Sequence, residues 1–279
     1  MKFQYLGTAA AEGFPAVFCN CEYCREAWKL GGKNFRTRSQ SIINDELLMD
    51  FPPDTLMHFH KHGIRGDKIK YIVFTHSHAD HYYATDLMRH GSCYAHNMTE
   101  EKLGIVCSEQ LCERMQKDLA GAKKDVILEY HVAKPFQSME LGEYTLIPFP
   151  ARHAGDNEGK QALFYAVKHQ GKTLLYAHDT GYFWEEIFDY IKENHLYFDM
   201  ISLDCTNAHL ESKPTNNHMG LNSNADVLAR LCEMGAVDEK TNCYVNHFSH
   251  NGNPLHEVLS ESAAKIGFKV SYDGLQLEI

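Results

Sequence analysis

Runs of apolar residues alternate along the chain with stretches of helical periodicity. Short runs rich in β-branched and aromatic residues, bounded by Gly, Pro, Asn or Asp, predict strands. The segments 162–179 and 268–279 each contain a turn signal, Gly171 in the first and Asp273-Gly274 in the second, and each predicts a β-hairpin. The strands that we expect lie over 2–8, 41–51, 71–76, 144–151, 162–179, 199–204, 242–248 and 268–279.

Amphipathic periodicity between the strands predicts helices over 53–62, 82–90, 108–120, 183–194, 224–234 and 254–265. Strands interrupted by helices indicate an α/β (α+β) fold with two mixed sheets packed face to face and covered outside by helices. No repeat or Pro/Gly/Ser-rich linker divides the sequence, so we expect a single domain over 1–279. Within it, 94–135 has the pattern of an amphipathic helical insertion near the site. This segment is a candidate lid or dimer contact, which makes a homodimer a candidate assembly.

The composition excludes several classes of protein. Hydrophobic residues make up 44% of the chain and charged residues 23%, as in ordinary globular proteins. No apolar run approaches the roughly 20 residues of a membrane span, and the first residues lack the hydrophobic core of a secretory signal, so we expect a cytoplasmic protein without a membrane partner. The net charge of −10 argues against an extended nucleic acid as partner. A small anionic substrate fits better, because bound metal ions can supply local positive charge.

Residues 74–83, FTHSHADHYY, concentrate potential metal ligands directly after an apolar strand. His76 and His78 lie on one side of an extended segment, because side chains alternate along it. Asp80 and His81 follow where the chain turns into a helix. Four such ligands in six residues can serve two metal ions, and imidazole and carboxylate suit Zn²⁺, Mn²⁺ or Fe²⁺. The sequence therefore predicts a dinuclear metal centre.

This motif resembles the signature of the metallo-β-lactamase superfamily, whose αββα sandwich carries a metal site at one edge. Further matching positions each follow a predicted strand: His153 in PARHAG, Asp179 in YAHDTG and His247 in VNHFSH. The resemblance extends from about residue 3 to the C-terminus. It implies two metal ions bridged by Asp179, one held by His76, His78 and His153 and the other by Asp80, His81 and His247.

Three further side chains, and the ligand Asp80 itself, are expected to have additional roles at the site. Asp80 is expected to take part in catalysis as well as in metal binding. Asp50 ends a predicted strand and is expected to accept a hydrogen bond from a ligand histidine. Asp156 and Asn157, just after the PARHAG histidine, are expected to shape the rim of the site.

Three cysteines, Cys19, Cys21 and Cys24, form a C-x-C-x₂-C motif. The chain has nine cysteines, an odd count, and this clustering argues for reduced thiols rather than a disulfide framework. Thiolates at this spacing predict a structural zinc knuckle that lacks one ligand. Residues 7–27 resemble two branches of the superfamily, the cyclic phosphodiesterase of the carbon–phosphorus lyase pathway and the B protein of pyrroloquinoline quinone biosynthesis. The first resemblance implies that His250, three residues after the last catalytic ligand, is the fourth zinc ligand.

A dinuclear hydrolase also needs a group that protonates the leaving oxygen. His218 precedes the helix expected at 224–234, and Asp204 ends the strand before it. The resemblance to phosphodiesterases and tRNA endonucleases implies that His218 is the general acid and that Asp204 orients it. From the residues alone, Asp204 also suits a strand-end carboxylate that caps backbone N–H groups, and His209 is an alternative to His218.

These features predict a dinuclear metal-dependent hydrolase whose motifs are most similar to the cyclic phosphodiesterase. The resemblance implies two catalytic divalent metals, zinc or manganese with iron as a further candidate, and one structural zinc. It implies that a metal-bridging hydroxide attacks a small cyclic phosphodiester while His218 serves as general acid. Two alternatives stay open: a nuclease like the tRNA 3′-end endonucleases, although the chain lacks their long basic arm, and a non-hydrolytic protein like the quinone-biosynthesis branch. A glyoxalase-type thioesterase would leave the three-cysteine motif and His218 unexplained.

Overall fold

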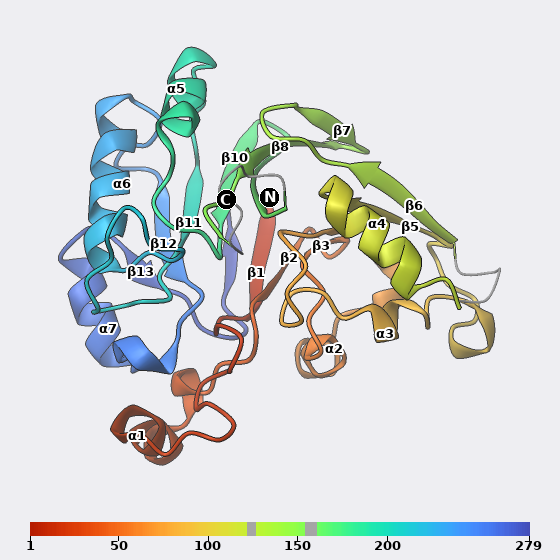
Figure 1. Ribbon diagram of the computed structural model, residues 1–279, viewed down its shortest axis with the longest axis horizontal. Helices are drawn as coiled ribbons and strands as arrows, with labels where there is room; N and C mark the ends of the chain where they lie inside the picture. The colour runs from red at the N-terminus through yellow and green to blue at the C-terminus, as the bar shows by residue number, and fades with distance from the viewer. Residues whose placement is uncertain (122–126, 154–160) are drawn as a thin grey trace.

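The computed structural model describes residues 1–121, 127–153 and 161–279, and these residues form two seven-stranded sheets (Figure 1). The first sheet contains β1 (Lys2–Gly7), β2 (Gln40–Ile43), β3 (Leu47–Met49), β4 (Tyr71–Val73), β5 (Lys102–Cys107), β6 (Ile127–Val132) and β14 (Gln276–Glu278). The second contains β7 (Met139–Leu141), β8 (Tyr144–Pro150), β9 (Leu163–His169), β10 (Lys172–Ala177), β11 (Met200–Asp204), β12 (Asn242–Asn246) and β13 (Lys269–Val270). Their orders are β14-β1-β2-β3-β4-β5-β6 and β13-β12-β11-β10-β9-β8-β7.

Helices cover the outer faces of both sheets. They are α2 (Thr55–His62), α3 (Ala84–Leu87), α4 (Glu109–Asp118), α5 (Glu185–Glu193), α6 (Leu221–Glu233) and α7 (His256–Ala264), while α1 (Glu22–Leu30) projects beyond the sheets (Figure 1). Apolar residues of α3 and α4 pack on the first sheet, and those of α5, α6 and α7 pack on the second. The expected αββα sandwich is therefore confirmed. In the described part of the chain, no helix has the length and apolar character that crossing a membrane would require.

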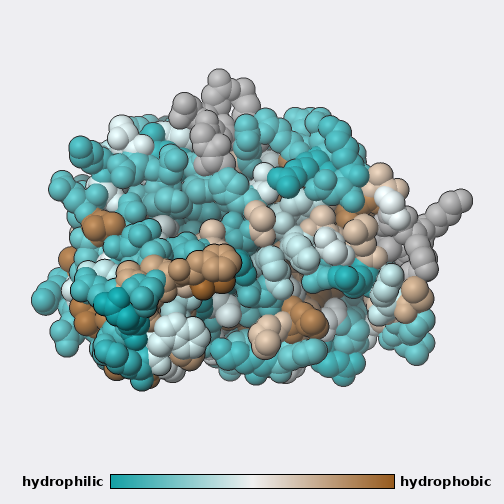
Figure 2. All heavy atoms as spheres, turned by 60° about the horizontal axis from the view of Figure 1, so that its bottom comes forward, coloured by the Kyte–Doolittle hydropathy of each residue, from teal (hydrophilic) through white to brown (hydrophobic). Residues whose placement is uncertain are grey.

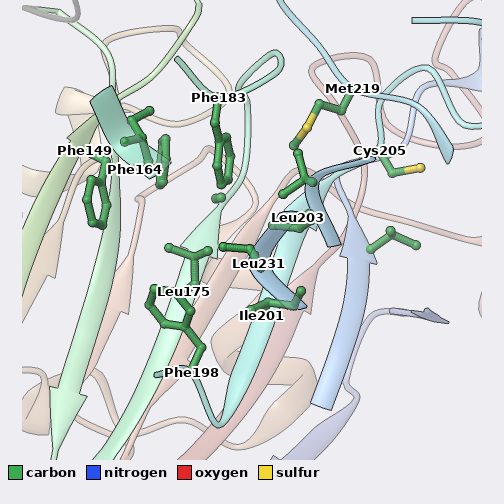
Figure 3. Close-up of a cluster of buried hydrophobic side chains, with 14 of the residues drawn as sticks. Phe149, Phe164, Leu175, Phe183, Phe198, Ile201, Leu203, Cys205, Met219 and Leu231 are labelled. Atoms are coloured by element: carbon green, nitrogen blue, oxygen red, sulfur yellow. The ribbon is translucent and has the colours of Figure 1, made fainter. Parts of the chain in front are cut away.

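The core has separate apolar layers. Between the sheets, Phe3 and Tyr5 of β1 pack with Tyr165 of β9 and Tyr176 of β10, all without solvent exposure. A second layer lies between the second sheet and its helices, where Figure 3 shows a cluster of aromatic and aliphatic side chains from β9, β10, β11 and α6. Both faces of the central strands of the second sheet are therefore buried, which agrees with their nearly continuous apolar sequences.

Two strand predictions were wrong in detail. The expected strand 41–51 is a hairpin of β2 and β3, joined by Asn44 and Asp45 at φ 50° and 60°. Positive φ at both central residues is what a tight hairpin turn requires. The Asp273-Gly274 turn does not form a hairpin, because β13 belongs to the second sheet and β14 to the first. The hairpin around Gly171 is confirmed by the antiparallel pairing of β9 and β10.

The helical insertion expected at 94–135 was also wrong in the part that the structure describes. This segment supplies β5 and β6, which pair in parallel at the edge of the first sheet, and α4 between them. Its apolar run KLGIVC is a buried strand rather than one face of a helix. The Arg114 guanidinium of α4 donates a hydrogen bond of 2.9 Å to the carbonyl oxygen of Ser77. Helix α4 therefore braces the loop that carries the histidine motif.

Candidate metal centre

The predicted metal ligands lie on loops that directly follow strands. Strands β10, β11 and β12 are parallel neighbours, so the loops after them leave the same edge of the second sheet. Three carboxylate and imidazole positions at strand ends have left-handed backbone: Asp50 at φ 64°, Asp179 at φ 56° and His247 at φ 66°. Such conformations are unfavourable for these residues and occur mainly where the surrounding structure holds a functional side chain in place.

The structure brings the seven residues expected at the dinuclear centre into two overlapping clusters. In each cluster the candidate ligand atoms lie within 4.8 Å of one another. Asp179 belongs to both, as a bridging carboxylate would. The first cluster holds His76, His78, His153 and Asp179, and the second holds Asp80, His81, Asp179 and His247.

Short distances connect the ligand atoms through Asp179. Its Oδ2 lies 3.1 Å from Nε2 of His76 and 3.2 Å from Nε2 of His81, while its Oδ1 lies 3.3 Å from Nδ1 of His153. Nε2 of His247 lies 3.3 Å from Nε2 of His81, so two ring nitrogens face each other. The four imidazoles thus point at one carboxylate from different sides.

Hydrogen bonds on the far side of the rings fix which nitrogen faces the cluster. Nδ1 of His81 donates to Oδ2 of Asp50 at 2.8 Å, as expected for Asp50. The Thr75 hydroxyl donates to Oδ1 of Asp50 at 3.0 Å and can therefore only accept from Nδ1 of His76, also at 3.0 Å. Both imidazoles therefore direct Nε2 at the cluster, and the unprotonated nitrogen is the form that binds a metal ion. Burial disfavours a charged His81, but Asp50, Asp179 and Asp80 raise its pKa well above the usual range, so a metal ion bound there would displace a proton from Nε2.

Thr206 fixes which ring nitrogen of His247 faces the cluster. Its hydroxyl donates to Oδ2 of Asp204 at 2.9 Å and accepts from Nδ1 of His247 at 2.7 Å. Sequence reasoning missed Thr75 and Thr206, although both stand one or two positions from residues that it had selected. A threonine next to a predicted ligand, or two positions after a strand-end carboxylate, is the sequence signal that could have identified them.

The donor set fits divalent cations. Nε2 of His76, Nδ1 of His153 and Oδ1 of Asp179 are buried and have no hydrogen-bond partner among the described residues. Buried polar atoms are costly without a partner, and a cation between them would satisfy all three. Burial lowers the pKa of His76 to about 3 and also lowers the pKa of His153, so both rings are neutral as ligands must be. Burial would raise the pKa of Asp179, but the imidazoles around it hold that pKa well below its usual range.

His218 and Asp204 lie beside these clusters. Nδ1 of His218 is 3.2 Å from Oδ1 of Asp179 and 3.5 Å from Oδ2 of Asp204. Burial disfavours the charged ring, but these carboxylates raise the pKa of His218 to about 9. The alternative residue His209 lies outside this group, since its ring contacts the carbonyl oxygen of Gly252 and the hydroxyl of Ser262.

Hydrogen bonds hold both oxygen atoms of the Asp204 carboxylate. Its carboxylate accepts backbone N–H bonds from Asp179, Thr206 and Met219 at 2.9 to 3.1 Å. Figure 3 shows the neighbouring Cys205 and the Met219 side chain within the apolar cluster under the helices. Asp204 therefore caps backbone groups, and it also lies in contact with His218, as a residue that orients that ring would.

The predicted zinc knuckle is assembled as well. The Sγ atoms of Cys19 and Cys21 lie 3.4 and 3.6 Å from Nδ1 of His250, and all four candidate ligand atoms lie within 4.8 Å of one another. Backbone N–H groups of Cys21, Cys24 and Ala16 donate to the three sulfur atoms. Three sulfurs with one imidazole form a donor set typical of structural zinc.

Both histidines of the HFSH sequence border one cavity of about 440 Å³. Its wall also includes Glu12, Asn207 and Asn251, which sequence reasoning did not select. Glu12 accepts a hydrogen bond of 2.6 Å from the hydroxyl of Ser249. The expected rim residues 156 and 157 lie outside the described residues.

Comparisons with known proteins agree with this geometry. A family model described as the beta-lactamase superfamily domain matches residues 47–238. The coenzyme PQQ synthesis protein B of Acinetobacter baumannii (strain ACICU) is 23% identical over 327 residues, covering 100% of both chains. Among solved structures, a diphosphatase from the PhnP family has a TM-score of 0.74 and 22% identity, covering 100% of this chain and 97% of that one. Zn²⁺-bound PqqB from Methylobacterium extorquens has a TM-score of 0.77 and 17% identity, covering 100% of both chains. At these identities, the solved structures support the fold alone.

Proposed function

The chain belongs to the beta-lactamase superfamily, and from this premise we propose that it is a dinuclear metal-dependent phosphodiesterase acting on a small cyclic phosphodiester. The observation that carries the proposal is the sharing of Asp179 by two ligand clusters beside His218, in one cavity of about 440 Å³. A cavity of that volume suits a small molecule rather than a polymer. The net charge of −10 weighs in the same direction against a tRNA substrate.

The proposed ligands divide as the two clusters do. His76, His78 and His153 would hold one cation, and Asp80, His81 and His247 the other, with Asp179 between them. When bound, two divalent cations supply Lewis acidity that activates water and neutralises charge on phosphoryl oxygens. The knuckle of Cys19, Cys21, Cys24 and His250 would hold a separate structural zinc.

In this proposal, the chain itself handles the proton of the leaving group. Nδ1 of His218 faces Asp179 and Asp204, which leaves Nε2 to donate its proton to the leaving oxygen. Asp204 cannot rotate away, because Met219 and Thr206 hold its carboxylate. A general acid positioned in this way contributes about 10²- to 10⁴-fold to the rate.

The test is direct hydrolysis by purified protein loaded with Zn²⁺ or Mn²⁺. Nucleoside 2′,3′-cyclic phosphates and bis(p-nitrophenyl) phosphate are suitable substrates. We expect turnover of both, with the His76→Ala protein inactive as the matched control. Absence of turnover with either metal, in protein whose metal content is complete, would contradict the proposal. Precursor tRNA is included as a third substrate, and its cleavage would favour an endonuclease instead.

One observation favours a second candidate function. The full-length similarity to a coenzyme PQQ synthesis protein B, at 23% identity, supports a non-hydrolytic role in cofactor biosynthesis. In that case a catalytic proton donor would be unnecessary. A single metal ion per chain besides the knuckle zinc, together with no effect of His218→Asn on the protein's biological activity, would favour this candidate.

A further inference from the structure

Phe18 is fully exposed, at the end of the loop that enters the zinc knuckle. In Figure 1 this loop and α1 project beyond the sheets at the bottom of the view. Figure 2, which brings that side forward, shows brown hydrophobic patches on a mainly hydrophilic surface, including patches on the half that carries α1 and α7. Single exposed apolar side chains are common, but here the adjacent Val17 is exposed as well, and both side chains line one cavity.

The loop is held rigidly although its tip is exposed. Phe14 exchanges two backbone hydrogen bonds with Arg36, at 2.7 and 2.9 Å. The N–H of Cys19 donates to the carbonyl oxygen of Ala16 at 3.0 Å, and Ala16 in turn donates to Sγ of Cys24. The knuckle cysteines on the C-terminal side of Phe18 therefore fix its backbone. This arrangement fixes the backbone at Phe18 and leaves the ring open to a ligand.

A second cavity, of about 460 Å³, lies against Phe18 and adjoins the catalytic cavity. Glu12 lines both cavities. Cys19, in the wall of the second cavity, lies 3.4 Å from His250, in the wall of the first. The two cavities thus adjoin at Glu12 and at the knuckle residues Cys19 and His250, so a molecule bound at the metals that extends past Glu12 would approach Phe18.

The wall of the second cavity combines an aromatic face with fixed polar groups. The Arg38 guanidinium is held by the carbonyl oxygen of Ala11 at 2.9 Å and by Oδ2 of Asp54 at 3.0 Å. Glu12 offers a carboxylate oxygen to a hydroxyl or amine group. An aromatic face stacks on any nucleobase, a planar guanidinium can stack beside it, and a carboxylate suits a ribose hydroxyl.

We propose that Phe18 is a specificity-determining residue that stacks on the base of a nucleoside phosphodiester whose phosphate lies at the metals. This proposal rests on the proposed function and narrows its substrate class to phosphodiesters that carry a nucleobase. It also gives the zinc knuckle a role, since the knuckle holds the backbone of Phe18 beside the cavity that adjoins the catalytic one.

The experiment compares two substrates in one set of variants. Adenosine 2′,3′-cyclic phosphate carries a base, and ethylene cyclic phosphate does not. Phe18→Ala should raise KM for the adenosine substrate about tenfold or more relative to the base-free one, while kcat changes little. Phe18→Tyr keeps the aromatic face and should restore the wild-type KM. Trp28→Ala removes another exposed aromatic of the knuckle region that lines neither cavity, and should behave as wild type.

Equal KM changes for the two substrates, or none, would overturn the proposal. The proposal would also be overturned if sedimentation showed a wild-type dimer that Phe18→Ala disrupts, with no KM difference between the two substrates. The ring would then contact a second copy of the chain. If the wild-type protein hydrolyses neither substrate, the proposed function fails, and calorimetric binding of AMP and ribose 5-phosphate decides the subsite separately. Binding of AMP about tenfold tighter than ribose 5-phosphate in the wild type but not in Phe18→Ala supports the subsite, and equal binding overturns it.

Discussion

Replacing Thr206 by valine removes one hydroxyl group and preserves the shape of the side chain. In the structure that hydroxyl accepts from Nδ1 of His247 at 2.7 Å and donates to Asp204 at 2.9 Å, in a buried position. Leaving a buried donor without a partner costs about 1–3 kcal/mol. Loss of an outer hydrogen bond to a ligand histidine typically weakens metal binding about 10- to 100-fold, which is about 1.4–2.8 kcal/mol. The first figure is a cost in folding stability and the second a loss of metal affinity.

The neighbouring carboxylate reduces the expected effect. Oδ2 of Asp204 lies 3.4 Å from the same nitrogen of His247 and can accept part of its hydrogen bond. We therefore expect Thr206→Val to lower the affinity for the metal ion at His247 about tenfold, near the lower end of the range. Competition with a chromophoric chelator measures this affinity, and the knuckle zinc should be unaffected. Thr206→Ser keeps the hydroxyl and is the matched control. An unchanged affinity in a correctly folded valine variant would refute the role given to this hydroxyl.

Three further results are expected. His218→Asn should lower kcat about 10²- to 10⁴-fold for substrates with alkoxide leaving groups but far less for p-nitrophenyl esters, and an equal loss for both would argue against proton donation. A Cβ at Gly181 would lie 1.9 Å from the carbonyl oxygen of Asn216, so Gly181→Ala should displace the loop that carries His218. Steady-state kinetics should then show kcat reduced about 100-fold with full metal content, and a normal kcat would show that this loop tolerates the shift. Cys24→Ser should release one zinc ion per chain and lower Tm, since the knuckle joins the segment before α1 to the His250 turn; an unchanged zinc content would exclude the knuckle.

Much of the site could be predicted because its residues follow strands that have clear apolar patterns. The motif at 74–83 and the single residues Asp179 and His247 each come after such a strand, and the structure brings them together. The left-handed backbone of Asp179 and His247 could not be predicted, because neither is a glycine and no local pattern marks the position. Thr206 could not be assigned either, since a hydroxyl acquires its role only when β11 and β12 pair and bring Asp204 and His247 to one edge.

The errors in the fold have related causes. In 41–51 the apolar residues on both sides of Asn44 and Asp45 concealed a turn, although that polar pair is itself a turn signal. Strand β5 was missed because the short apolar run KLGIVC adjoins an amphipathic helix and the two patterns merge. Helix α1 was not predicted, because the cysteine spacing was interpreted as a metal-binding loop. In the structure, Cys21 is the N-cap of this helix and Cys24 lies in its first turn.

His247 and His250 are proposed to serve two different metal centres although they are three residues apart. Elemental analysis of the wild type, His247→Ala and His250→Ala after mild chelation distinguishes two centres from one. We expect about three metal ions per chain in the untreated wild type, one of them resistant to chelation. His247→Ala should retain the resistant zinc and lose activity, and His250→Ala should lose that zinc. Loss of the same metal ion from both variants would contradict the account.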